Sequence, residues 1–238
     1  MSDGALDVDG LVARARERGV RPSVADHISR DVAGSIKSVE GVEAYLDTLD
    51  EHPVLRGGEF CWHDALWREI SDALVARFTH RVGSLHAIHL PDGTLVHAFG
   101  RRIPDGLAPD EYMDAHVAEA GRFAAEMPVD ILAHPTLLPI ALRTIPLEDL
   151  WTEPREEQLV SALFAAGIAF EVSNRYRPHE RLVRRAFERG VRISLGSDGH
   201  TAEQVANVEW PLQLTRRIGV ADQDLYDPTA HGSRTRPA

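Results

Sequence analysis

Short apolar runs alternate with longer amphipathic stretches along this chain. In the longer stretches apolar residues recur every three to four positions, which predicts helices over residues 7–18, 38–49, 64–78, 109–127, 153–166, 179–189 and 201–218. The short runs predict six strands, near residues 21–25, 54–58, 81–88, 129–133, 168–173 and 191–196. Alternation of helices and strands is typical of an α/β fold with a parallel sheet, and here of an α/β barrel.

Two further segments have their own local signals. Asp92-Gly93 lies between short apolar runs and predicts a hairpin over residues 90–99. The residues after about Asp222 are rich in Asp, Pro, Ser and Arg, a composition typical of a mobile tail. We therefore expect one domain over residues 1–220, followed by a flexible tail over residues 221–238.

The predicted strands end in side chains that bind metal ions. In chain order these are His27, Glu59, His86, His134 and the pair Asp198 and His200. The carboxyl ends of the strands of an α/β barrel lie on one face, where its active site is built. Carboxylates and imidazoles are ligands suited to zinc, manganese or iron. Because the pattern recurs at five strand ends, the sequence predicts a metal site on that face.

The ordered motifs resemble those of the PHP family, named for polymerase and histidinol phosphatase, over residues 2–219. The matching segments are Ser2-Asp3-Gly4, Ala25-Asp26-His27, Gly58-Glu59, Gly83-Ser84-Leu85-His86, Leu132-Ala133-His134-Pro135, Phe170-Glu171-Val172-Ser173-Asn174 and Gly196-Ser197-Asp198-Gly199-His200. No single motif is specific, but the ordered set is. The resemblance implies a distorted (β/α)7 TIM-like barrel.

The sequence departs from the family at its first motif. The family begins with a His-x-His strand shortly before Ser-Asp-Gly, whereas Met1 directly precedes Ser2 here. We therefore expect a PHP-type barrel with the first strand missing, its place lying between the strands near 21–25 and 191–196. Two explanations stay open: a natural protein that starts further upstream, or a degenerate member with little activity.

The resemblance also implies an activity and a ligand set. PHP phosphoesterases hydrolyse small phosphomonoesters or nucleotide-type phosphodiesters through a metal-activated water, with two or three Zn, Mn or Fe ions. The implied metal ligands are Asp3, His27, Glu59, His86, His134, Asp198 and His200. Asp198 and His200 are also the expected catalytic residues, with Asp198 orienting the attacking water. Hydrolysis of a non-phosphate bond and a non-catalytic role are the alternatives.

Three residues beyond the strand near 168–173 are candidates for substrate binding. Arg175 and Arg177 carry guanidinium groups that match phosphate geometry, and Asn174 precedes them. The flank of a following helix is an equally good explanation for the two arginines. Most remaining histidines are expected at the surface or on helices, and His63 and His97 are the first of these to reconsider.

Composition narrows the class of partner. The chain has 238 residues and a formal charge of −11. This negative charge disfavours electrostatic binding to nucleic acid but allows a nucleotide-type substrate. Its single cysteine, Cys61, excludes an internal disulfide and fits a reducing compartment. No apolar run approaches the ~20 residues of a membrane span, and no signal peptide is visible. We therefore expect a cytoplasmic protein that acts on a small phosphorylated substrate.

Overall fold

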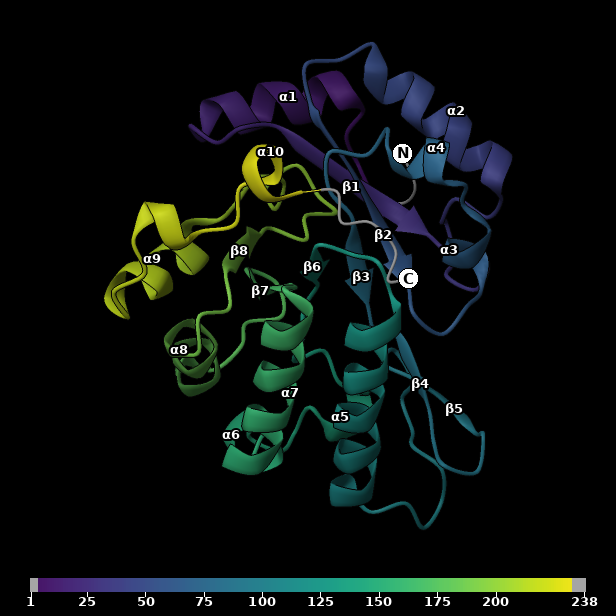
Figure 1. The fold of residues 1–238 in the computed structure, drawn as a ribbon, viewed down its shortest axis with the longest axis vertical. Helices are drawn as coiled ribbons and strands as arrows, with labels where there is room; N and C mark the ends of the chain where they lie inside the picture. Colours follow the sequence, from purple (N-terminus) through teal and green to yellow (C-terminus); the bar gives the residue numbers. More distant parts are fainter. Residues whose placement is uncertain (1–3, 233–238) are drawn as a thin grey trace.

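A computed structural model describes residues 4–232 as an α/β fold built around one curled sheet (Figure 1). Its spatial order is β1-β2-β3-β6-β7-β8, and all five neighbouring pairs are parallel. The strands are β1 (Ser23–Ile28), β2 (Leu55–Cys61), β3 (Val82–Ser84), β6 (Ile131–Leu132), β7 (Ala169–Ser173) and β8 (Ile193–Gly196). The six predicted apolar runs are therefore confirmed as the six strands of a half-barrel.

Helices cover the outer side of this sheet (Figure 1). The longer ones are α1 (Val8–Glu17), α2 (Val39–Asp50), α5 (Pro109–Glu126), α7 (Glu153–Ala166), α8 (Glu180–Glu188) and α9 (Glu209–Arg217). Local chemistry favours several of their ends: the Asp7 and Ser38 side chains cap α1 and α2, and Gly167 ends α7 with a positive φ of 65°. Their apolar faces share one buried core with the sheet.

The expected helix over residues 64–78 is wrong. Two short helices, α3 (Leu66–Glu69) and α4 (Asp72–Val75), take its place. Ile70 is extended between them, with φ −68° and ψ 122°, and the Ser71 side chain accepts a hydrogen bond from the Leu74 backbone. The apolar residues keep a helical period across this segment, but Ser71 acts as an N-cap that starts a new helix.

The expected helix over residues 201–218 is also wrong in its first half. Only α9 (Glu209–Arg217) is helical there, and residues 201–206 form bends and turns. The Gln204 side chain accepts hydrogen bonds from the backbone of His200 and Thr201, and Ala206 has a φ of +60°. This local bonding replaces the first helical turns and holds the loop that carries His200.

The strand expected over residues 81–88 divides in two. β3 ends at Ser84, and Ala87–His89 forms β4, which pairs antiparallel with β5 (Leu95–His97). The predicted Asp92-Gly93 turn is confirmed between β4 and β5, with Gly93 at φ +87°. The resulting hairpin extends beyond the carboxyl edge of the sheet, beside His86.

The chain after residue 220 differs from the expected mobile tail. It forms the short helices η2 (Asp222–Asp224) and α10 (Pro228–His231). The Tyr226 amide donates a 2.8 Å hydrogen bond to the Ile193 carbonyl, and Arg21 pairs with Asp227 at 2.6 Å. Residues 222–232 therefore lie along the free edge of β8 and reach the segment before β1. Residues 233–238 lie outside the described part of the chain.

The remaining short elements are η1 (Ile140–Leu142) and α6 (Leu147–Leu150), which connect β6 to α7. Within residues 4–232, none of the helices has both the length and the apolar character that crossing a bilayer requires.

Candidate metal centre

The parallel register brings the polar strand ends together. His27 in β1 lies directly opposite Glu59 in β2. His86 and His134 follow the ends of β3 and β6, which are the next two strands in the sheet. Because parallel strands all end at the same edge, these side chains come from four neighbouring positions on one rim.

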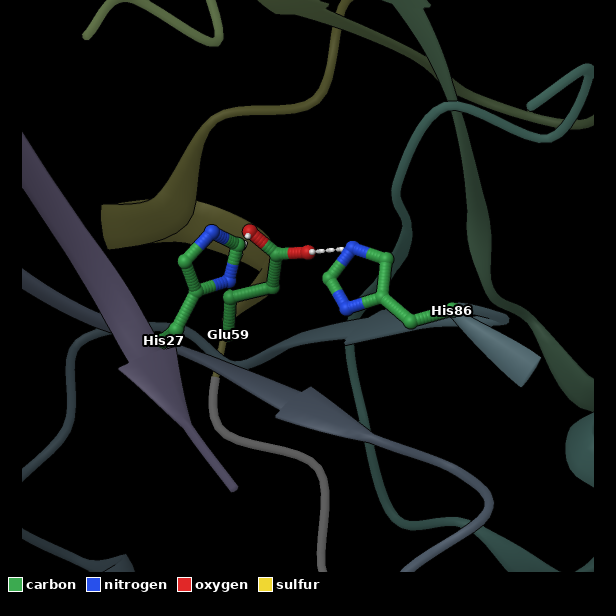
Figure 2. A group of neighbouring side chains, drawn as sticks. All are labelled: His27, Glu59 and His86. Atoms are coloured by element: carbon green, nitrogen blue, oxygen red, sulfur yellow. Dashed lines mark ion pairs between the residues drawn. The ribbon is translucent and has the colours of Figure 1, made fainter. Parts of the chain in front are cut away.

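The Glu59 carboxylate is the centre of the cluster. Its Oε2 lies 3.3 Å from His27 Nδ1, and its Oε1 lies 3.2 Å from His86 Nε2. His134 Nε2 is 3.1 Å from the same Oε1. Figure 2 shows the His27 and His86 rings reaching the carboxylate from opposite sides. Three imidazoles therefore surround one buried carboxylate.

Asp198 and His200 lie on the same rim, just beyond β8. The His200 ring centroid is 6.0 Å from that of His27, and His200 Nδ1 is 3.6 Å from Asp198 Oδ1. Arg175 contacts the His200 ring and lies 3.9 Å from Asp198 Oδ1. Predicted ligands from β1, β2, β3, β6 and β8 thus gather at one place.

The backbone is strained at two of these positions. His134 has a φ of +30° and Asp198 a φ of +46°, values that side chains larger than glycine rarely adopt. Strain of this kind concentrates at functional sites, where the surrounding structure holds it in place. Both strained residues belong to the rim.

The protonation states follow from burial and mutual charge. Burial opposes ionisation of Glu59, but the facing histidines, His27 first, hold its pKa well below the usual range. Burial also opposes the charged form of His134, yet the hydrogen bond and charge of Glu59 outweigh it and raise that pKa to about 9. Burial lowers the pKa of His86 to about 3. Glu59 and His134 therefore form an ion pair, and His86 is neutral.

Glu171 is a site residue to which the sequence analysis gave no role, although it lies within one of the matching motifs. Its Oε2 accepts a 2.6 Å hydrogen bond from the His134 amide, and burial raises the pKa of Glu171 to about 7. A Cβ at Gly196 in neighbouring β8 would overlap this carboxylate. The strand pattern could have indicated this position. Glu171 alternates with Phe170 and Val172 in β7, so its side chain faces the opposite side of the sheet from theirs.

Cys61 and Ser84 orient the His86 ring. Cys61 Sγ lies 3.0 Å and Ser84 Oγ 3.3 Å from His86 Nδ1, which leaves Nε2 facing Glu59. Burial raises the pKa of the Cys61 thiol, so it stays protonated and can donate to Nδ1. Groups that hold the far nitrogen of a ligating histidine fix its tautomer and orientation. In the sequence Cys61 follows Glu59 by two residues, but nothing there indicates a contact with His86.

Other predicted residues lie apart from the cluster or cannot be placed. The Arg177 guanidinium stacks on Trp210 of α9, with its central carbon 4.9 Å from the ring centroid. The backbone amide of Asn174 donates a hydrogen bond to the Gly196 carbonyl, and this bond joins the ends of β7 and β8. His89 is exposed on the hairpin, whereas His86 is buried at the centre. Asp3 lies outside the described residues.

A cavity of about 420 Å³ adjoins the cluster. Side chains of the two edge strands, among them Val24 and Leu195, line it together with rim residues. The rim residues that border it are His27, Glu59, His134, Glu171, Asp198 and His200. The candidate centre is therefore open to a small molecule.

The donor set fits a divalent ion of the zinc class. Single ligand atoms of His27, Glu59 and His86 all lie within 4.8 Å of one another, and His134 Nε2 adds a fourth donor. Imidazole nitrogens with a carboxylate oxygen are the usual ligands of catalytic zinc. With Asp198 and His200 nearby, the rim offers more donors than a single ion uses.

Two solved structures of similar fold come from proteins described as histidinol phosphatases. A protein assigned as a histidinol phosphatase from Listeria monocytogenes matches with a TM-score of 0.67 and 13% identity, over 84% of this chain and 92% of that one. A histidinol phosphate phosphatase from Lactococcus lactis, in complex with Zn, L-histidinol and phosphate, matches with a TM-score of 0.63 and 13% identity, over 92% and 90%. At this identity the likeness shows a shared fold. Searches of protein-family models and of curated protein sequences found no match.

Proposed function

We propose that this chain is a metal-dependent phosphoesterase of the PHP type, acting on a small phosphomonoester or a nucleotide-type phosphodiester. The observation that carries the proposal is the Glu59 carboxylate within 3.1–3.3 Å of nitrogens from His27, His86 and His134. The shared fold supports it, because the Lactococcus protein was solved with Zn, L-histidinol and phosphate. A PHP-type (β/α)7 barrel geometry with its first strand missing, and a cytoplasmic location, belong to the same proposal.

His27, Glu59, His86 and His134 would hold the metal, with Asp198, His200 and Asp3 as further ligands. Two or three ions of zinc, manganese or iron fit the proposal, and Glu59 would be among their ligands. When bound, such ions polarise a phosphoryl oxygen and lower the pKa of water. The Cys61, Ser84 and Glu171 contacts described above would keep the imidazoles of His86 and His134 oriented.

Arg175 and Asp198 have the clearest roles in the reaction. Arg175 would bind the substrate phosphate, since a guanidinium offers paired donors to phosphate oxygens and this one already lies on the rim. The Asp198 carboxylate would accept a proton from the attacking water. Burial raises the pKa of Asp198, which makes its ionised form a stronger base. Arg177 and Asn174 stay predictions as substrate contacts.

A hydrolysis panel tests the proposal. Metal-stripped and zinc- or manganese-loaded protein would be assayed with p-nitrophenyl phosphate, bis-p-nitrophenyl phosphate and p-nitrophenyl acetate. We expect metal-dependent release from one of the phosphate esters, abolished by Glu59→Gln and kept by the control His89→Ala, which changes an exposed histidine of the hairpin. Cleavage of the acetate alone would favour a hydrolase of a non-phosphate bond. No hydrolysis by a fully metal-loaded protein would overturn the proposal.

A further inference from the structure

A second cluster of metal-binding side chains lies beside the hairpin. Asp31 follows β1, His63 follows β2 and His97 ends β5. His63 Nε2 is 3.0 Å from Asp31 Oδ2, and His97 Nδ1 is 3.8 Å from the same oxygen. None of these three residues belongs to the cluster around Glu59.

The distances suit a single ion. Tetrahedral zinc with ligands at about 2.0–2.1 Å holds those ligand atoms roughly 3.4 Å apart. The two measured separations from Asp31 Oδ2 fall on either side of that value, and the three ligand atoms all lie within 4.8 Å of one another. The His63 and His97 rings meet edge to face at 5.7 Å.

The cluster contains one buried side chain and two that are exposed to solvent. The His63 side chain is 2% exposed, whereas those of Asp31 and His97 are 48% and 47% exposed. Burial lowers the pKa of His63, which keeps its ring in the neutral form that coordinates metals. An ion could enter from solvent, and water could complete its coordination.

Hydrogen bonds already fix the backbone that carries these ligands. Asp64 Oδ2 accepts hydrogen bonds from the Ser29 hydroxyl and the Arg30 amide, and Ser29 Oγ accepts one from the Asp31 amide at 3.2 Å. On the hairpin side, the Ala98 amide donates to the His86 carbonyl at 2.8 Å. Because these hydrogen bonds already restrict the two segments, binding an ion would cost little further conformational entropy.

We propose that Asp31, His63 and His97 bind one divalent ion of the zinc class, separate from the ions of the Glu59 centre. Two imidazoles and one carboxylate form a ligand set used by zinc and by non-haem iron. The bound ion would tie the loop after β1 to the β4–β5 hairpin. That hairpin continues into Phe99, whose ring lies 5.3 Å from His86, so the ion would also fix one wall of the rim.

Cobalt titration tests this site without any activity assay. Metal-stripped Glu59→Gln/His86→Ala protein, which lacks two ligands of the first centre, would be titrated with Co²⁺ and followed by its visible absorption. We expect one tightly bound ion and a metal-dependent rise in Tm. Adding His97→Ala or Asp31→Asn should abolish both, while the control His89→Ala, on the same hairpin, should leave both unchanged.

Two safeguards keep the result decisive. If the double variant does not fold, equilibrium dialysis of the otherwise native chain should show His97→Ala and Asp31→Asn each binding one zinc ion fewer than His89→Ala. Both substitutions are at half-exposed side chains, so the metal-free Tm should stay close to that of the native chain. Cobalt or zinc binding that is unchanged by both substitutions would overturn the second site, whether or not the Glu59 centre hydrolyses phosphate esters.

Discussion

At the scale of single residues, the candidate centre depends on atoms that do not themselves bind metal. The Cys61 thiol and the Ser84 hydroxyl both face His86 Nδ1, and the Glu171 carboxylate holds the His134 amide. The Cys61 and Ser84 contacts select which nitrogen of His86 faces Glu59, and the Glu171 contact fixes the backbone that carries His134. Outer partners of this kind commonly change metal affinity or activity by about 10- to 100-fold when they are removed.

Cys61→Ala should therefore weaken zinc binding by about 10- to 100-fold while leaving every ligand in place. Cys61→Ser should recover most of the affinity, because a hydroxyl can also donate to His86 Nδ1. Competition against a chromophoric zinc chelator measures both affinities. Equal affinity for the native chain and Cys61→Ala would mean that the thiol only fills space.

Gly196→Ala tests the packing around Glu171. The added methyl group would overlap the Glu171 carboxylate, and we expect a destabilisation of about 1–3 kcal/mol together with a loss of hydrolysis. Gly121→Ala in α5 is the matched control, because a Cβ there meets no atom within 4 Å. Urea unfolding compares the two variants. A tolerated Gly196→Ala would show that β8 shifts easily and that Glu171 is not closely held.

At the scale of elements, the sequence predicted the strands well and several helix boundaries poorly. Strands appear as apolar runs because both faces of a parallel sheet are buried, and that signal depends little on context. The interruption at Ile70–Ser71 and the turns before α9 depend on local hydrogen bonds, those of Ser71 and Gln204, which compete with helical ones. Apolar periodicity continues across both positions and so conceals them.

The helix α5 carries a titratable group whose effect on stability has a definite sign. Burial lowers the pKa of His116 from 6.5 to about 4. Between these values the unfolded chain binds a proton that the folded chain does not, so stability falls as the pH falls from 6.5 toward 4. The slope is about 1.4 kcal/mol per pH unit for one such group.

His116→Phe should make the acid destabilisation shallower by about one proton, since phenylalanine cannot titrate and can keep the edge-to-face contact with Trp151. Urea unfolding at several pH values between 4 and 7 measures the slope. His89→Gln, at an exposed position of β4, should leave it unchanged. A slope that is the same in His116→Phe and in the native chain would show that His116 titrates normally in the fold.

At the scale of the whole molecule, the strand-end pattern was enough to predict the candidate centre, and the edges of the sheet were not predictable. Strand ends gather because the sheet is parallel, so His27 and Glu59 face each other, and His86 and His134 lie on the same rim two residues beyond β3 and β6. Residues 222–232 instead dock along β8 through backbone contacts at Ile193 and an ion pair with Arg21. The composition of this segment does not indicate which part of the fold it contacts.

The ion pair between Glu59 and His134 makes metal binding depend on pH. His134, with a pKa near 9, carries a proton at neutral pH and must release it before its nitrogen can coordinate an ion. Zinc affinity at the Glu59 centre should therefore rise with pH up to about 9 and then level off. Calorimetric titration in buffers of different ionisation enthalpy should detect proton release, which His134→Gln should reduce.

The most direct test of the central claim relates metal occupancy to chemistry in one preparation. Metal-stripped protein would receive zinc in steps, with bound zinc and the initial rate of phosphate-ester hydrolysis measured at each step, in the native chain and in Glu59→Gln. We predict that the rate rises with zinc bound at the Glu59 centre and stays near zero in Glu59→Gln. Full occupancy of the centre without hydrolysis, or equal rates in the two proteins, would contradict the assignment of this rim as a phosphoesterase site.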